Sequence, residues 1–238
     1  MQVDIITWMQ QYLNKLKHLF GSRLVLVGLQ GSYSREEATD SSDIDMVVIL
    51  DHAEPEDLKA YGIMLDSLPN REKICGFISG LQELKNWERS DLFQFYYDTI
   101  PILGSIDFLK ELIGKEDVRR SVRIGACNIY HMCGHNMVHE KDREMLKALY
   151  KSAVFTVQAI SYLQMGTYRK RKTELLPVLQ QPEREILETA IVLKQQTDLT
   201  QVDFERLSEQ LFRWASHLIA EYQPDETKAH IESGCPDV

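Results

Sequence analysis

The sequence predicts an α+β protein in two parts, a small mixed sheet with helices followed by an all-helical bundle. Two observations lead to this prediction. Over residues 1–105, apolar runs of strand length alternate with segments of helical period. From residue 106 onward only segments of helical period follow, with breaks at Gly114 and Gly166. We therefore expect a first domain over 1–105 and a helical domain over 106–238.

The first part begins with a helix, because apolar side chains recur at a period near 3.6 from Val3 to Phe20 and Gly21 then ends the pattern. The run at 43–50 is apolar on both faces, which is typical of a central strand. The other elements expected here are strands at 24–27 and 74–78, helices at 54–68 and 88–98, and a strand or an extended link at 100–103.

The second part consists of stretches in which apolar residues recur with helical spacing. Without strands to cover, these helices are expected to pack on one another as a bundle. The stretches are 106–114, 116–140, 142–166, 182–196 and 201–222.

Composition narrows the functional classes. A chain of 238 residues suits one large domain or two small ones, and 44% hydrophobic with 26% charged residues is ordinary for a soluble globular protein. The net charge of −9 argues against nucleic-acid partners, which need a basic surface. No apolar segment has the length of a membrane span, and the N-terminal sequence lacks the pattern of a signal peptide.

The cysteines indicate the compartment. Cys75, Cys127, Cys133 and Cys235 show neither CxxC spacing nor a paired framework. This usage favours a reducing environment, so we expect a cytoplasmic protein.

The most informative segment is the one that leads into the apolar run at 43–50. Gly31 and Ser32 form a small-residue turn, and Asp43 and Asp45 stand at the head of the strand. Because alternate strand residues face the same side, the two carboxylates project together and favour a hard cation such as Mg²⁺. The backbone N–H groups at Gly31 can approach a phosphate closely. The segment thus combines a metal site with a phosphate cradle, the two parts that phosphoryl-type transfer needs.

These residues resemble a known family. Gly31-Ser32, the spacer, and Ser42-Asp43-Ile44-Asp45 before four apolar residues resemble the signature of the nucleotidyltransferase superfamily related to DNA polymerase beta. The two-part layout, with a helical bundle after the sheet, is similar to bacterial aminoglycoside-type adenylyltransferases, in which substrate binds between the two parts. The resemblance implies a Mg²⁺-dependent enzyme that moves AMP from ATP to a hydroxyl of a small molecule, such as an aminoglycoside-like acceptor.

The resemblance also assigns roles to residues. Asp43 and Asp45 would be the catalytic residues and the metal ligands, and Gly31, Ser32 and Ser42 would hold the nucleotide phosphates. The dense basic run at 169–172 would place Arg171 or Lys172 on the triphosphate. Lys147 and Lys151 lie one turn apart on one helix face, and either is a further candidate for phosphate contact.

One expected part is missing. The family carries a third Asp or Glu on the next strand, but here residues 73–79 contain no acid, and the expected position falls near Cys75. The carboxylates that stay open as substitutes are Glu72, Glu83 and Asp98, with Glu140 and Glu144 in the helical part as alternative bases. Losing a general base typically costs about 10²–10⁴ in rate, so the sequence leaves turnover open.

A second cluster lies in the helical part. Cys127, His131, His135 and His139 recur every four residues, which places them along one slowly drifting stripe of a helix. A linear stripe supplies two ligands to a metal, and Gly134 is expected to interrupt the helix. A polar seam between helices or a substrate-facing wall therefore fits the stripe better than a metal centre.

Three functions remain open at this point. The first is the small-molecule nucleotidyltransferase described above, and the second is a nucleotidyltransferase that modifies a protein. The third is a nucleotide-binding protein without turnover, favoured by the missing carboxylate. The acceptor, the preferred base and the oligomeric state do not follow from the sequence.

Overall fold

The computed structural model describes residues 3–196 and 198–224, and these divide into two compact units at the boundary between Gly114 and Lys115. The first unit is α+β, and the regular secondary structure of the second, within its described residues, consists of helices. The elements of the first unit are α1 (Ile5–Phe20), η1 (Gly21–Arg23), β1 (Leu24–Leu29), α2 (Gly31–Ser34), β2 (Ile44–Leu50), α3 (Pro55–Asp66), η2 (Arg71–Lys73), β3 (Ile74–Gly80), α4 (Leu81–Lys85), α5 (Arg89–Asp98), β4 (Ile100–Leu103) and η3 (Asp107–Leu112).

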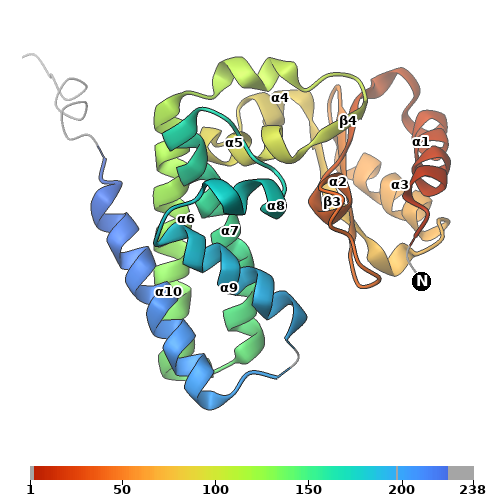
Figure 1. The fold of residues 1–238 in the computed structure, drawn as a ribbon. Helices are drawn as coiled ribbons and strands as arrows, with labels where there is room; N and C mark the ends of the chain where they lie inside the picture. The colour runs from red at the N-terminus through yellow and green to blue at the C-terminus, as the bar shows by residue number, and fades with distance from the viewer. Residues whose placement is uncertain (1–2, 197, 225–238) are drawn as a thin grey trace, which may run out of the picture. The chain divides into compact units, whose positions relative to one another are not determined.

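The described strands form one mixed sheet in the order β3-β2-β1-β4 (Figure 1). β1 pairs antiparallel with both β2 and β4, whereas β2 and β3 run parallel. β2 is an inner strand, as its apolar sequence predicts, and Ile44 and Met46 to Leu50 are all buried. The segment at 100–103, which the sequence left as a strand or a link, is the edge strand β4.

The two faces of the sheet belong to different cores. Ile44, Met46 and Val48 pack with residues of α1 and α3 on one face. Val47 and Ile49 pack on the other face with residues of α4, α5 and η3. The helices flank the sheet in the same way in Figure 1. By the alternation of strand residues, Asp45 belongs to the α4 and α5 face.

The first unit extends further along the chain than the sequence suggested. The predicted boundary is at 105, but the compact units divide after Gly114, and the expected helix at 106–114 is the 3₁₀ segment η3 of the first unit. The physical reason is burial, because Ile106 and Leu109 pack in the core cluster of Leu26 and Val47. Hydrophobic period alone does not tell which core a short segment joins.

The second unit is built from long packed helices. α6 packs against α7 and α10, and α7 also packs against α9. Their buried residues include Val122, Tyr150, Leu187 and Leu211. The elements are α6 (Lys115–His135), the π-helical turn η4 (Asn136–Glu140), α7 (Arg143–Met165), α8 (Lys172–Leu175), η5 (Leu176–Val178), α9 (Glu183–Gln195) and α10 (Gln201–Glu221).

Two further observations concern membrane spans and cysteines. Within residues 3–196 and 198–224, no helix combines the length and the apolar character that a membrane crossing requires. Cys75 and Cys127 are exposed free thiols, and burial raises the pKa of the free thiol of Cys133 to about 11. Cys235 lies outside the described residues.

Candidate functional site

The predicted carboxylates lie at the N-terminal end of β2. Asp43 is exposed immediately before the strand, Asp45 is its second residue and is half-buried, and Ile44 between them is fully buried. Because Ile44 points into the core shared with α1 and α3, Asp45 faces the opposite side of the sheet. Asp43 lies one residue before the strand, at the point where the sheet ends, and its projection to the same side as Asp45 stays a prediction.

The glycine turn lies directly against one of these carboxylates. Gly31 begins the one-turn helix α2 with a φ of +68°, a left-handed conformation that favours glycine. A Cβ on residue 31 would lie 2.7 Å from Cγ of Asp45 and closer still to Oδ2. The backbone N–H of Gln30 donates to the carbonyl of Asp45 at 2.8 Å and holds the turn beside β2. The turn and the second aspartate, distant in sequence, therefore form one site.

Ser42 shapes the loop that leads into the site. Its hydroxyl accepts a hydrogen bond from the backbone N–H of Thr39 at 2.8 Å, and its own N–H donates to the carbonyl of Thr39 at 3.0 Å. Lys73, just before β3, donates to the carbonyl of Asp40 at 2.6 Å. These contacts fix the loop ahead of Asp43, and a phosphate contact by Ser42 stays a prediction.

The residue beside Asp45 on the neighbouring strand is a cysteine. In the parallel register of β2 and β3, Asp45 pairs with Cys75, and Cys75 is exposed. Paired residues of adjacent strands face the same side of a sheet. The register therefore places a thiol next to Asp45, at the position where the sequence predicts a missing carboxylate.

The other acidic candidates have different surroundings. Glu72 is exposed in η2, which immediately precedes β3 and lies at the same end of the sheet as Asp43. Glu83 lies in α4, beyond Gly80, and the length of β3 separates that end from Cys75. Of these two, Glu72 lies at the sheet end that carries the aspartate pair.

Asp98 has a contact that the sequence did not reveal. Its buried carboxylate accepts a hydrogen bond from Arg35 at 2.9 Å, and its carbonyl accepts from the hydroxyl of Ser34 at 3.2 Å. Gln30 donates a further hydrogen bond to the Thr99 hydroxyl at 2.7 Å. These contacts tie α2 to the end of α5, so Asp98 has a structural role beside the glycine turn. No sequence spacing signals these pairs, because each joins segments more than sixty residues apart.

The candidates of the helical unit lie on α7 and at the start of α8. Lys151 is an exposed residue of α7, and Lys172 begins α8. Lys147 contacts Glu144 at 2.7 Å, and Glu140 contacts His135 at 3.4 Å. The roles proposed for the two lysines in phosphate binding stay predictions.

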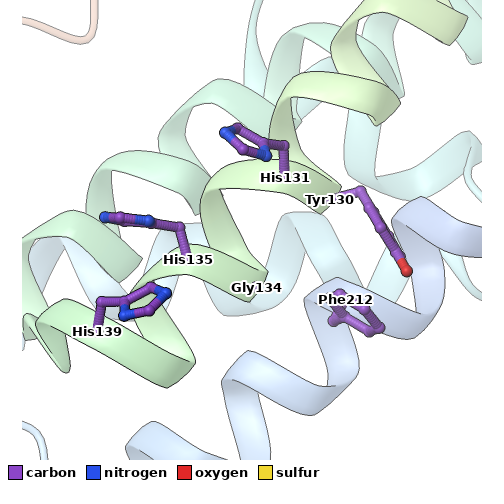
Figure 2. A pocket seen from close by; sticks show the side chains of 6 residues that line it. All are labelled: Tyr130, His131, Gly134, His135, His139 and Phe212. Atoms are coloured by element: carbon purple, nitrogen blue, oxygen red, sulfur yellow. The ribbon is translucent and has the colours of Figure 1, made fainter.

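The histidine stripe lines a pocket of the helical unit (Figure 2). Gly134 is predicted to interrupt the helix, but this prediction is wrong, because α6 continues through it to His135 and ends in a π-helical turn. Tyr130 stacks on Phe212 of α10, with ring centroids 4.2 Å apart. The cavity of about 330 Å³ is lined by Tyr130, His131, Gly134, His135, His139 and Phe212.

Neither the aspartate pair nor the histidine stripe has three or more ligands placed as in a closed metal centre. Among residues 3–196 and 198–224, no group of three or more His, Cys, Asp and Glu side chains is arranged to hold a metal ion. The histidine stripe is thus no such centre. Mg²⁺, however, is commonly held by only one or two carboxylates together with substrate phosphates and water. The donor set of Asp43 and Asp45, two neighbouring carboxylates, fits that second kind of site.

Comparison with known proteins identifies the first unit. Residues 9–117 match the family model of the nucleotidyltransferase domain. Residues 9–117 therefore belong to the nucleotidyltransferase superfamily. The matched region runs from within α1 to the first turn of α6, and it contains the glycine turn and both aspartates. The comparison with curated protein sequences finds no match.

One solved structure shares the fold beyond this domain. The spectinomycin adenyltransferase AAD(9) from Enterococcus faecialis, solved with ATP and spectinomycin, is 15% identical and superposes with a TM-score of 0.55. The match covers 87% of this chain and 98% of that chain, so it includes the helical unit. A nucleotidyltransferase-like protein from Exiguobacterium sibiricum is 11% identical, with a TM-score of 0.32 over 90% of this chain and 75% of that chain. The fold thus resembles an aminoglycoside-type adenylyltransferase, as the sequence predicts.

Proposed function

We propose that the protein transfers AMP from ATP to a hydroxyl of a small molecule in a Mg²⁺-dependent reaction. The nucleotidyltransferase domain supports nucleotide transfer in general. The likeness to AAD(9), a protein solved with ATP and an antibiotic, supports ATP and a small acceptor as the more specific choice. An aminoglycoside-like or aminocyclitol acceptor is the first class to test.

One observation carries this proposal. The carboxylate of Asp45 lies against the turn at Gly31, where any side chain would overlap with it. This close packing supports the proposal, because a carboxylate suited to a cation and a glycine backbone suited to a phosphate are then neighbours. A turn before a strand does not by itself require a carboxylate next to the glycine.

The residues take the following roles in the proposal. Asp43 and Asp45 hold Mg²⁺, which when bound neutralises charge on the phosphates of ATP. Gly31 and Ser32 contact the β- and γ-phosphates through backbone N–H groups and the serine hydroxyl, and Ser42 is a further phosphate contact. Lys151 and Lys172 of the helical unit are proposed as additional cations for the triphosphate.

The proposed reaction is an in-line displacement at the α-phosphorus. The oxygen of the acceptor hydroxyl forms a bond to the α-phosphorus, and the bond from that phosphorus to the bridging oxygen of the β-phosphate breaks. Pyrophosphate leaves with the electron pair of the broken bond. The hydroxyl proton passes to a base, for which Glu72 is the acidic candidate at the same end of the sheet.

A specific observation keeps a second function in view. The neighbour of Asp45 on β3 is the thiol of Cys75 rather than a carboxylate. A site with two carboxylates holds a second divalent cation less well, which lowers the rate of transfer. The second candidate is therefore a nucleotide-binding protein with little turnover, or one whose acceptor is a protein.

The deciding experiment incubates the full chain with ATP labelled at the α-phosphate, Mg²⁺ and a panel of hydroxyl compounds that includes spectinomycin and aminoglycosides. Parallel reactions contain lysate proteins. The proposal expects a labelled small-molecule product that EDTA abolishes. Label found only on protein favours the protein-modifying alternative. Mg²⁺-dependent ATP binding without any labelled product contradicts the transferase.

A further inference from the structure

A buried glutamine holds the backbone of the basic run that follows α7. Gln158 is only 2% exposed and lies in the interior of α7. Its amide nitrogen Nε2 donates to the carbonyl of Arg169 at 3.2 Å and to the carbonyl of Lys170 at 3.0 Å. Its carbonyl oxygen Oε1 accepts from the hydroxyl of Tyr168 at 3.2 Å. Both ends of one buried amide are therefore committed to a single short segment.

The segment returns along the helix that it has just left. α7 ends at Gly166 in a left-handed conformation, and the N–H of Gly166 donates to the carbonyl of Tyr162 at 2.8 Å. Gln158 lies two helical turns before this end, and the residues that follow the helix fold back to contact it. We call residues 168–172 the basic loop. Gln158 holds this loop through the side chain of Tyr168 and through the backbone carbonyls of Arg169 and Lys170.

The charge of the basic loop makes this rigidity informative. Arg169, Lys170, Arg171 and Lys172 are consecutive cations in a chain whose net charge is −9. Consecutive like charges repel one another, and a loop free to move would spread them apart. Holding their backbone in one arrangement favours a ligand with several negative charges, because the cost of ordering the loop is met before the ligand arrives.

We propose that Gln158 is a positioning residue that holds the basic loop as a binding site for the polyphosphate group of a nucleotide. This inference rests on the proposed function, which supplies the ligand class. Arginine and lysine side chains make strong charge-assisted hydrogen bonds to phosphate oxygens. Gln158 contacts the backbone of these residues, so it acts through the loop.

The test measures binding of inorganic tripolyphosphate to the full chain by titration calorimetry without divalent cations. Gln158→Met keeps the side-chain length and removes all three hydrogen bonds. We expect its Kd to rise about tenfold, because the loop must then be ordered at the moment of binding. Gln164→Met is the matched control, an exposed glutamine of the same helix, and should leave Kd unchanged.

Two features of the titration separate positioning from general stability. A variant that is merely misfolded binds with a lower stoichiometry and an unchanged Kd, whereas a displaced loop changes Kd at full stoichiometry. Hydrogen exchange at residues 167–172 should also become faster in Gln158→Met. In a background with Arg169→Gln and Lys170→Gln, the two residues whose carbonyls Gln158 contacts, the effect of Gln158→Met should disappear, because a positioning residue acts only through the residues it holds.

A milder variant keeps the inference testable if Gln158→Met does not fold. Tyr168→Phe removes one hydrogen bond to Oε1 and should weaken tripolyphosphate binding about threefold, consistent with the loss of a single neutral hydrogen bond. Wild-type affinity in both variants, or no tripolyphosphate binding by the unmodified protein, overturns the inference.

The outcomes also distinguish this inference from the proposed function. Tripolyphosphate binding that depends on Gln158, without nucleotide transfer to any acceptor, retains the basic loop as a polyphosphate site and removes the transferase. Transfer that proceeds with unchanged KM for ATP in Gln158→Met retains the transferase and removes the inference.

Discussion

Gly31 and Asp45, fourteen positions apart in the sequence, are in direct contact, because the Cα of the glycine faces the carboxylate of the aspartate. The turn therefore sets the position of the carboxylate, and the carboxylate limits which residue the turn accepts. The positive φ of Gly31 adds a second constraint of the same kind. This pair joins the proposed cation site to the proposed phosphate cradle.

Gly31→Ala should displace the Asp45 carboxylate, since a Cβ at residue 31 would overlap with Oδ2 and the left-handed backbone would be strained. We expect the rate of nucleotide transfer to fall about 100-fold, the usual effect of a misplacement near 1 Å. Mn²⁺ binding, measured by electron paramagnetic resonance, should weaken in parallel.

The matched control for this change is Gly62→Ala. Gly62 lies in α3 with open space around the position of a Cβ, so alanine there should leave transfer and Mn²⁺ binding unchanged. Equal activity of Gly31→Ala and Gly62→Ala would mean that the Gly31–Asp45 contact has no role in the reaction.

Cys75→Asp should improve the site. The change puts a third carboxylate next to Asp45, on the same face of the sheet. We expect tighter Mn²⁺ binding and transfer about tenfold faster or more, in view of the contribution of a third ligand or base. Cys75→Ser, which keeps the size without adding charge, should stay near the wild type. If the two variants behave alike, the thiol is not the weak point of the site.

Much of this arrangement follows from local sequence, and some of it does not. β2 was predictable because its sequence is a continuous apolar run, and the aspartate pair because two aspartates at alternate positions begin that run. α1 was predictable because Val3 to Phe20 keep one helical period. These features depend on residues close together in the chain, where periodicity and turn chemistry operate.

The remaining features depend on contacts between distant segments. The pairing of Asp45 with Cys75 requires the strand register, and the ion pair of Arg35 with Asp98 requires α5 to pack beside α2. The extent of the first unit depends on where Leu109 is buried. None of these follows from spacing, because tertiary packing selects among segments with the same local pattern. Similarly, α6 passes through Gly134 because packing against α10 outweighs the low helical propensity of one glycine.

The stability of the first unit should depend on pH through Asp57. Arg23 donates to both carboxylate oxygens of Asp57 at 2.7 and 2.8 Å, and this hydrogen bonding lowers the pKa of Asp57 to about 2. A carboxyl with a lowered pKa stabilises the folded state above its unfolded pKa, and that contribution is lost as the pH falls toward 2. We therefore expect the melting temperature of the wild type to fall as the pH is lowered from about 4 to about 2.

Asp57→Asn should remove most of this dependence. At neutral pH its melting temperature should be about 2–4 °C below the wild type, a typical loss at a helix start in a chain of this size. The control is Asp66→Asn, which breaks the exposed pair with Arg71 and should have little effect. Parallel acid melting curves for the wild type and Asp57→Asn would contradict the assignment.

The central claim is that Asp43 and Asp45 bind nucleotide together with Mg²⁺. The most direct test is calorimetric titration of the full chain with ATP, carried out once in the presence of MgCl₂ and once in the presence of EDTA. A variant with both Asp43→Asn and Asp45→Asn serves for comparison, once its melting temperature shows that it is folded like the wild type. Mg²⁺ should tighten ATP binding in the wild type and have no effect in the double variant. The same Mg²⁺-dependent affinity in both proteins would mean that these aspartates do not bind nucleotide through Mg²⁺.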